Sequence, residues 1–243
     1  MKKAVRSILA SLTVICLPVM ASETVNVAID PTFPPMEFLV AGERAGFDID
    51  FAEELQKRAD LSFAYTDMDF KAMVPSVVSG RQDMILSAIY ITDERAKVVD
   101  FTNSYFAAGL VILVRSDEER IKSAADLDGK RVAVQVGNKA VNLLKTDYPA
   151  VNRLEMEKNN QLFDALESGR ADAVVIGRPA AMLFAKTTGI GKVLPEPLTD
   201  ENYGIAVSKR KPELREALNT AIADMKADGT MTKLVDKWFG TQE

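Results

Sequence analysis

The sequence predicts an α/β protein built from two similar lobes, each a sheet flanked by helices. Strand and helix patterns follow one another as β-α-β-α-β twice along the chain, an order typical of parallel strands joined by crossover helices. The segment SGRQDM at residues 79–84 also recurs as SGRADA at residues 168–173. Each copy combines a helix end, a glycine turn and an aspartate that opens a buried strand. We therefore interpret the two copies as equivalent turns in two equivalent lobes.

The first β-α-β-α-β segment occupies residues 24–89. Alternating β-branched residues, helical apolar spacing and turn residues predict its elements. In order, we expect a strand over 24–29, a rigid turn over 30–38, a helix over 49–59, a strand over 61–68, a helix over 70–79 and a strand over 83–89. Asp48 or Asp50 is placed to cap the first helix. Gly80 stands where a left-handed residue would end the second helix. The last strand is apolar throughout, as in a buried parallel sheet.

The second segment repeats this order. We expect a strand over 131–137, a helix over 138–148, a strand over 153–158, a helix over 160–168 and a strand over 172–177. Gly169 takes the place of Gly80 as the residue that ends the second helix. The two lobes are therefore expected to have the same core topology.

Two further stretches, residues 105–130 and 202–209, contain strand patterns that would carry the chain between the lobes, and two crossings imply a hinge. The resulting organisation is a discontinuous first lobe of residues 22–110 and 206–243 and a second lobe of residues 111–205. The chain ends in two helices over 212–229 and 230–240. We expect their apolar face to pack on the first lobe; it comprises Leu214, Leu218, Ile222 and Met225.

The N-terminus has the pattern of a secretory signal peptide. Three basic residues among the first six precede an apolar run over 8–20, and small residues before position 22 predict cleavage after Ala21. A transmembrane anchor is the alternative, but it needs about 18–20 apolar residues, and this run is shorter and interrupted by Pro18. A lipid anchor on Cys16 is a second alternative, although Ile15 stands where a small residue is required. The pattern favours export to the periplasm.

Composition excludes several classes of function for the exported chain. Histidine is absent and the single cysteine is Cys16, so cleavage leaves no disulfide, no thiol nucleophile and no Ser-His-Asp triad. Three of the 30 Lys and Arg residues lie in the leader, which leaves 27 against 35 Asp and Glu, a formal charge of −8. An acidic exported protein is a poor binder of nucleic acid.

Six motifs in order resemble the periplasmic solute-binding proteins of polar amino-acid ABC importers. They are AIDPTFPPMEF, AGFDIDFAEEL, ITDERAKVVDFTNSYF, DLDGKRVAVQVGNKA, SGRADAVV and NYGIAVSK, and the resemblance covers residues 23–240. It implies the type II periplasmic-binding-protein fold, in which two lobes joined by two strands close on a small ligand. It also implies an inner-membrane ABC permease as partner, a monomer and no cofactor.

The resemblance identifies candidate residues for a ligand carboxylate. Arg95 of ITDER matches the family's carboxylate clamp, and a guanidinium fork suits two parallel bonds to a carboxylate. Ser87 matches a position that supplies backbone and hydroxyl contacts. Asn138 and Lys139 match a helix N-terminus whose free amide groups would bind the same carboxylate. The alternatives are a surface arginine paired with a neighbouring acid and a buried serine whose hydroxyl is satisfied by the protein.

Three further positions match the walls of the cleft. Phe33 and Phe70 correspond to aromatic residues that stack on the ligand, although a lone phenylalanine is more often part of the core. Asp30 resembles an acid that meets an amino or guanidino group of the ligand. Its alternative is local, because an aspartate before Pro31 commonly caps a turn.

Three positions depart from the family pattern. Tyr90 replaces a small Ser or Thr, Ala88 replaces a common glycine, and Gly177 stands where the second lobe normally supplies an aspartate for the ligand's α-ammonium. Burial of an ammonium without a counter-ion is costly. Asp30 would have to replace that aspartate, Tyr90 would have to supply a dipole, or the ligand lacks an α-amine. Arg178 would favour a second ligand carboxylate or point to solvent.

The sequence therefore predicts a binding protein that presents a small carboxylate, an amino acid or a relative, to its permease. Two alternatives stay open. An enzyme on the same scaffold, such as a cyclohexadienyl dehydratase, would need a cleft carboxylate with a raised pKa. A sensory binding protein would share every feature described above.

Overall fold

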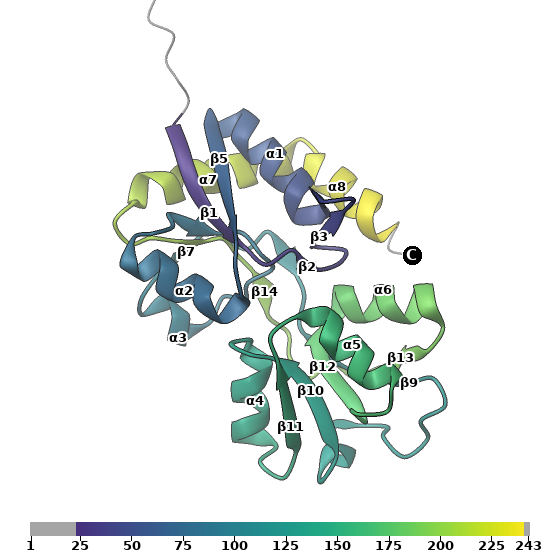
Figure 1. Ribbon diagram of the computed structural model, residues 1–243. Coiled ribbons are helices and arrows are strands. Elements are labelled where there is room, and N and C mark those ends of the chain that lie inside the picture. Colours follow the sequence, from purple (N-terminus) through teal and green to yellow (C-terminus); the bar gives the residue numbers. More distant parts are fainter. Residues whose placement is uncertain (1–22, 241–243) are drawn as a thin grey trace, which may run out of the picture.

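The computed structural model describes residues 23–240, and the predicted leader with Cys16 lies outside them. Two lobes are each built on a five-stranded sheet flanked by helices (Figure 1). Among the described residues, no helix combines the length and apolar character needed to cross a membrane. The predicted α/β architecture with one sheet in each lobe is confirmed.

The sheet of the first lobe has the order β5-β1-β6-β15-β7. β1 pairs in parallel with β5 and β6, whereas β15 is antiparallel to β6 and β7. The strands are β1 (Glu23–Ile29), β5 (Leu61–Asp67), β6 (Met84–Ile85), β7 (Asp100–Phe101) and β15 (Ala206–Val207). The helices are α1 (Phe47–Ala59), α2 (Phe70–Ser79), α3 (Asp93–Ala96), α7 (Pro212–Ala227) and α8 (Thr230–Phe239).

The sheet of the second lobe has the order β11-β10-β12-β9-β13, with its first three strands parallel. These strands are β9 (Leu110–Arg115), β10 (Arg131–Gln135), β11 (Asn152–Met156), β12 (Ala173–Gly177) and β13 (Gly191–Val193). The flanking helices are α4 (Lys139–Asp147), α5 (Asn159–Glu167) and α6 (Arg178–Thr188), with a short 3₁₀ helix over Ala124–Leu127. The second parallel β-α-β-α-β unit is therefore present as predicted.

The two crossings between the lobes lie side by side. β8 (Phe106–Ala107) and β14 (Asn202–Tyr203) form a separate antiparallel pair, so the predicted two-strand connection is confirmed. β9, which belongs to the second sheet, begins at Leu110, the last residue assigned to the first lobe from the sequence.

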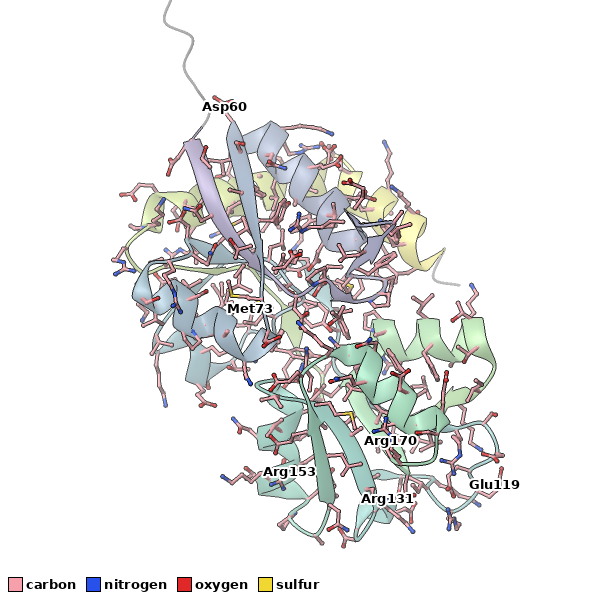
Figure 2. All side chains as sticks on the ribbon, viewed as in Figure 1. Asp60, Met73, Glu119, Arg131, Arg153 and Arg170 are labelled. Carbon is pink, nitrogen blue, oxygen red and sulfur yellow. The ribbon has the colours of Figure 1, made fainter. Side chains whose placement is uncertain are left out.

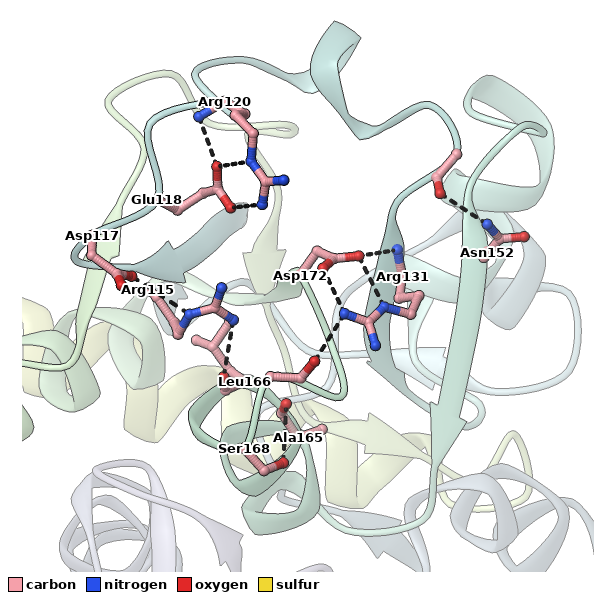
Figure 3. Close-up of polar contacts among 12 residues, drawn as sticks. Arg115, Asp117, Glu118, Arg120, Arg131, Asn152, Ala165, Leu166, Ser168 and Asp172 are labelled. Atoms are coloured by element: carbon pink, nitrogen blue, oxygen red, sulfur yellow. Dashed lines mark hydrogen bonds and ion pairs between the residues drawn. The ribbon is translucent and has the colours of Figure 1, made fainter.

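The aspartates of the repeated SGR segments make the same contact in both lobes. The Asp83 carboxylate accepts a 2.8 Å hydrogen bond from the Asn26 N–H of β1. The Asp172 carboxylate accepts a 2.9 Å bond from the Arg131 N–H of β10, and it also pairs with the Arg131 guanidinium (Figure 3). In return, the Asp83 N–H donates to the Asn26 carbonyl, and the Asp172 N–H donates to the Arg131 carbonyl. The two turns are equivalent, as the sequence predicted.

The helix ends follow the sequence in most places. Gly80 and Gly169 have φ values of 81° and 69°, the left-handed conformation that glycine adopts without a steric cost. The apolar face of α7 packs against α1 and β15 in the first lobe, as predicted. Its members are buried: Leu214, Leu218, Ile222 and Met225.

Two predictions at the start of the chain are wrong. The expected rigid turn forms a small antiparallel sheet of β2 (Thr32–Phe33), β3 (Glu37–Val40) and β4 (Glu43–Ala45). α1 begins at Phe47, after Gly46, and neither Asp48 nor Asp50 caps it. Asp48 lies inside the first turn with its side chain turned into the core, where it binds polar groups from other elements.

Two further elements differ from the prediction. The strand expected over 83–89 is limited to Met84–Ile85, and Tyr90 beyond it forms an isolated antiparallel bridge with Tyr203. α6 was not predicted, although Pro179 at its first turn is a common helix start.

Candidate functional site

The carboxyl ends of the parallel strands of both lobes face one another. Asp60, immediately before β5, and Arg131, at the start of β10, lie at opposite extremes of the molecule (Figure 2). The opposite ends of these strands therefore converge between the lobes, which is where ligands bind in open α/β sheets. The side chains that follow β1, β10 and β11 meet there.

Asp30 lies at the centre of this contact and is 1% exposed. Its N–H donates to the Ser87 hydroxyl at 3.0 Å. Across the lobes, one carboxylate oxygen accepts from Lys158 Nζ at 3.0 Å and the other from Gln135 Nε2 at 2.8 Å. Thr32 adds a local bond at 3.0 Å, so Asp30 also holds its own turn. Burial raises the pKa of Asp30, although Lys158 and the hydrogen bonds oppose this shift.

Lys158 connects the lobes twice. Its ammonium lies 3.0 Å from Asp30 and 3.0 Å from Asp69. Burial lowers the pKa of Lys158, but its bonds to Asp69 and Asp30 outweigh that effect and raise the pKa overall. The cation is therefore fully charged, and it supplies the positive partner of the buried Asp30 carboxylate.

Arg95 projects from α3 toward the second lobe. Nη1 donates to the Tyr90 carbonyl at 2.8 Å, and Nη2 donates across the gap to the Gly137 carbonyl at 3.1 Å. The guanidinium lies over the Phe70 ring at 5.6 Å. Within residues 23–240 no carboxylate lies at ion-pair distance from it, and desolvation lowers the pKa of Arg95 to about 10. The predicted clamp is thus a desolvated cation without an anionic partner among these residues.

Two cavities lie between the lobes. A groove of about 720 Å³ runs between α2, α3 and α4, and Arg95 and Lys139 line it. Behind it is an enclosed cavity of about 10 Å³, room for about one water molecule. Its walls include five predicted positions: Asp30, Phe33, Phe70, Ala88 and Asn138. An amino-acid-sized ligand can therefore enter the enclosed cavity only if the lobes separate or these side chains move.

Behind the cavity wall, Ser87 joins a buried network of acids. Its hydroxyl donates to Glu37 Oε1 at 2.7 Å while it accepts from Asp30, so both functions are used by the protein. The Asp48 carboxylate accepts from the Ala88 N–H at 2.9 Å and from the Tyr105 hydroxyl at 3.1 Å. Ala88 has a φ of 43°, in the left-handed region that glycine adopts freely and that other residues rarely adopt.

Glu37 and Asp48 are two buried acids of this network. Oε2 of Glu37 and Oδ1 of Asp48 make no hydrogen bond within the described residues. Desolvation raises the pKa of Asp48 to about 7 and, with the nearby Asp48 charge, raises the pKa of Glu37 well above its usual range. Burial therefore favours the protonated forms of these two acids.

At the N-terminus of α4, one backbone N–H that was predicted to be free is hydrogen-bonded. Asn138 caps the helix through its side chain, which accepts from the Ala140 N–H at 3.1 Å. The Asn138 N–H, predicted to be free, donates to the Gln135 carbonyl at 3.1 Å because the chain turns there. Lys139 pairs with Glu201, and burial and the nearby Arg95 charge lower its pKa.

Gly177 lies beneath a pair of tyrosines. The Tyr203 hydroxyl donates to Tyr90 at 3.4 Å, and the Tyr90 hydroxyl donates to the Gly109 carbonyl at 3.1 Å. A Cβ atom at residue 177 would collide with the Tyr203 hydroxyl and stand 3.0 Å from Phe33 Cζ. The aromatic rings thus fill the space that a side chain at this position would need.

Arg178, next in the chain, lies elsewhere. It lines a different groove, of about 590 Å³, between α6 and α8, and its N–H donates to the Gly109 carbonyl at 3.1 Å. It therefore adds no charge to the cavities beside Asp30 and Arg95.

The sequence reasoning missed four residues of this region. They are Glu37, Gln135, Lys158 and Tyr203. Gln135 and Lys158 had a usable signal, because each is polar and lies at or just beyond the carboxyl end of a parallel strand, β10 or β11, where sites form. Glu37 and Tyr203 had none, since their partners are distant in the sequence.

Comparison with known proteins gives a consistent result. Residues 25–241 match the family model of bacterial extracellular solute-binding proteins, family 3. The ABC transporter arginine-binding protein 1 of Escherichia coli (strain K12) is 34% identical over 246 residues, which cover 98% of this chain and 99% of that protein. An ancestral arginine-binding protein bound to arginine is 37% identical, with a TM-score of 0.85 over 90% of this chain and 100% of that one.

A third relative is described as the precursor of an enzyme. The ancestral amino acid-binding protein AncCDT-1, a precursor of cyclohexadienyl dehydratase, is 36% identical, with a TM-score of 0.84 over 91% of this chain and 97% of that one.

Proposed function

The chain belongs to the bacterial extracellular solute-binding proteins, family 3, and on that premise we propose that its cleft captures a small carboxylate through Arg95. Proteins of this kind are the periplasmic substrate-binding components of ABC importers. The two lobes close on the solute and present it to the permease. Ligand binding can drive closure only by interacting more favourably with the closed form.

The observation that carries this proposal is the state of Arg95. A desolvated guanidinium with only carbonyl partners gains most from an anion, because charge-assisted forked bonds to a carboxylate are stronger than bonds to neutral oxygens. Arg95 also lines the larger groove and lies over the face of Phe70, a residue that lines both cavities. A ligand carboxylate that replaced the Gly137 carbonyl as acceptor would still lie between the lobes.

The oligomeric state, the location, the partner and the ligand site are also parts of this proposal. We propose a monomer in the periplasm, released by cleavage after Ala21, with an inner-membrane permease as partner and the groove between the lobes as its ligand site. Residues contributing to that site are Asp30, Phe33, Phe70, Ser87, Ala88, Tyr90, Arg95, Asn138, Lys139 and Gly177. The protein releases its ligand unchanged.

One observation favours an enzymatic alternative. Glu37 lines the enclosed cavity and has the raised pKa that a general acid would need. Its Oε1 already accepts from the Ser87 hydroxyl, which favours a structural role. Incubation of the protein with bound ligand, followed by mass spectrometry of the recovered solute, separates binding from turnover.

The test of the clamp is calorimetry across amino acids, their 2-oxo and 2-hydroxy counterparts, and dicarboxylates. We expect Arg95→Ala to weaken carboxylate binding by about 10- to 100-fold, the effect of losing bonds worth about 1.5–3 kcal/mol. Arg95→Lys should recover only part of this, because an ammonium lacks the fork. Arg120→Ala, which removes an exposed arginine paired with Glu118, is the control. Unchanged affinity in Arg95→Ala would refute the proposal.

A further inference from the structure

Several acidic groups around the cleft are engaged by the protein. Asp69 pairs with Lys158, Glu157 with Lys71, and Glu201 with Lys139. Glu94 accepts a hydrogen bond from the Asn142 amide across the lobes at 3.0 Å. Glu94 and Asp147 line the groove without an ion-pair partner among the described residues, but both are exposed to solvent and neither lines the enclosed cavity beside Asp30.

Asp30 is engaged more completely than these exposed pairs. Its carboxylate accepts three side-chain hydrogen bonds, and one of the donors is the Lys158 ammonium. A ligand cation at this site would have to displace Lys158 from a carboxylate that is 1% exposed. Lys158 itself therefore supplies the positive charge at the position where a cationic ligand group would sit.

The second lobe offers no substitute. Position 177 has no room for any side chain beside Tyr203 and Phe33. The hydroxyls of Tyr90 and Tyr203 donate within the protein, so what they present to the cleft is mainly aromatic surface. Glu37, the remaining acid that lines the enclosed cavity, is fully buried, and this burial raises its pKa and so disfavours its charged form.

The positively charged side chains of the groove differ from the acids. Arg95 has no carboxylate partner among the described residues, and Lys139 lies in the same groove. Because Lys139 pairs with Glu201, Arg95 is the unmatched charge among the partly buried side chains of the groove. An α-amino acid would bring a carboxylate that Arg95 can neutralise and an ammonium for which the buried acids beside Asp30 are already engaged, and burial of an unpaired ammonium is unfavourable.

We propose that the cleft selects small carboxylates that carry no amine beside the carboxylate, and that Lys158 takes the place of a cationic ligand group at Asp30. This inference rests on the proposed function, because it assumes that Arg95 holds the carboxylate. It differs from the ligand preference stated in the name of the arginine-binding relative. The chemical class includes 2-oxo acids, 2-hydroxy acids and dicarboxylates.

Matched ligand pairs test the inference on the unmodified protein. Titration calorimetry would compare phenylalanine with phenylpyruvate, leucine with 4-methyl-2-oxopentanoate, and glutamate with 2-oxoglutarate. The members of each pair differ only at C2. We expect the tightest-binding pair to favour the amine-free member by at least about tenfold. Equal or tighter binding of the amino acid would overturn this inference and leave the proposed function intact.

Failure of the proposed function has a different signature. If no carboxylate of either kind binds, or if Arg95→Ala does not weaken the one that does, then the carboxylate site itself is wrong and this inference falls with it. The two failures are therefore distinguishable in one set of titrations.

Lys158→Gln tests the role of the lysine. The glutamine can still donate to Asp30, but it leaves the carboxylate without its positive partner. We expect the preference for the amine-free member to fall by about tenfold or more, through improved binding of the amino acid. Lys192→Gln, which removes an exposed lysine paired with Glu119 on the second lobe, should leave the preference unchanged. The same preference in both variants would contradict the role given to Lys158.

Discussion

The Cα atom of Gly177 lies directly against the hydroxyl end of Tyr203. A Cβ atom at position 177 would overlap that oxygen and come within 3.2 Å of the Tyr90 hydroxyl. Both tyrosines are 1% exposed and their rings are 4.8 Å apart, so neither has free space to move into. The tyrosine pair and the absence of a side chain at residue 177 are thus two parts of one packing arrangement.

We predict that Gly177→Ala destabilises the protein by about 1–3 kcal/mol, the usual cost of overpacking a core. Tyr203→Phe removes the oxygen that the new methyl group would meet, so the double variant should lose less stability than the two single variants together. Urea unfolding of the four proteins measures this coupling. Strictly additive losses would show that the contact does not limit position 177.

The raised pKa of Asp48 makes stability depend on pH. Because burial raises the pKa of Asp48 from 3.8 to about 7, the folded state binds more protons than the unfolded state between these values. Stability is therefore greatest at the acidic end of this window and declines as the pH rises from about 4 to about 7. The decline should amount to roughly 1–4 kcal/mol.

Asp48→Asn tests this prediction. An asparagine oxygen can still accept from the Ala88 N–H and the Tyr105 hydroxyl, and its NH₂ group can donate to Glu37. We expect the melting temperature of the variant to depend less on pH between 4.5 and 8 than that of the unmodified protein. An identical slope in both proteins would assign the pH dependence to other groups.

The aspartate that opens β12 should matter more than an ordinary surface acid. Asp172 accepts from the Arg131 N–H and pairs with the Arg131 guanidinium at 2.7 Å (Figure 3). We predict that Asp172→Ala lowers the free energy of unfolding by about 1–3 kcal/mol. Asp117→Ala is the matched control, because Asp117 pairs with Arg115 at 3.5 Å and its side chain is 82% exposed. Its effect should stay within about 0.5 kcal/mol.

The contribution of Asp172 to stability changes with pH in the opposite direction from that of Asp48. Its bonds to Arg131 lower its pKa, so its contribution is present at neutral pH and is lost as the pH falls below the ordinary value of 3.8. The difference in stability between Asp172→Ala and the unmodified protein should therefore shrink at acidic pH. A difference that stays constant down to pH 2 would indicate that the ion pair contributes nothing.

The bond between Gln135 and Asp30 is one of the buried contacts that join the two lobes. Gln135→Leu would leave one oxygen of a buried carboxylate without its cross-lobe donor, at a cost of about 1–3 kcal/mol. We predict a larger radius of gyration for this variant by small-angle X-ray scattering. Lys71→Gln, at the exposed pair with Glu157, should change it little. Equal values for both variants and the unmodified protein would place the main lobe contact elsewhere.

Local patterns in the sequence determined the repeated elements of both lobes. The two β-α-β-α-β segments and the left-handed glycines at residues 80 and 169 follow from short-range spacing or turn chemistry. Such signals reflect side-chain periodicity along one element, which needs no knowledge of distant residues. The SGR repeat belongs to the same class, since each copy sets one helix end and one strand start.

Only the tertiary structure decided the charges of the cleft. Lys158 and Gln135 reach Asp30 across 128 and 105 residues of sequence, and no local pattern encodes either contact. The same holds for Asp48, which the spacing predicted as a helix cap and which the fold buries beside Glu37. The sequence alone determined where the strands end and which residues follow them. The packing of two lobes against each other decided which of those charges remain unpaired, because pairing depends on distances that only the assembled chain fixes.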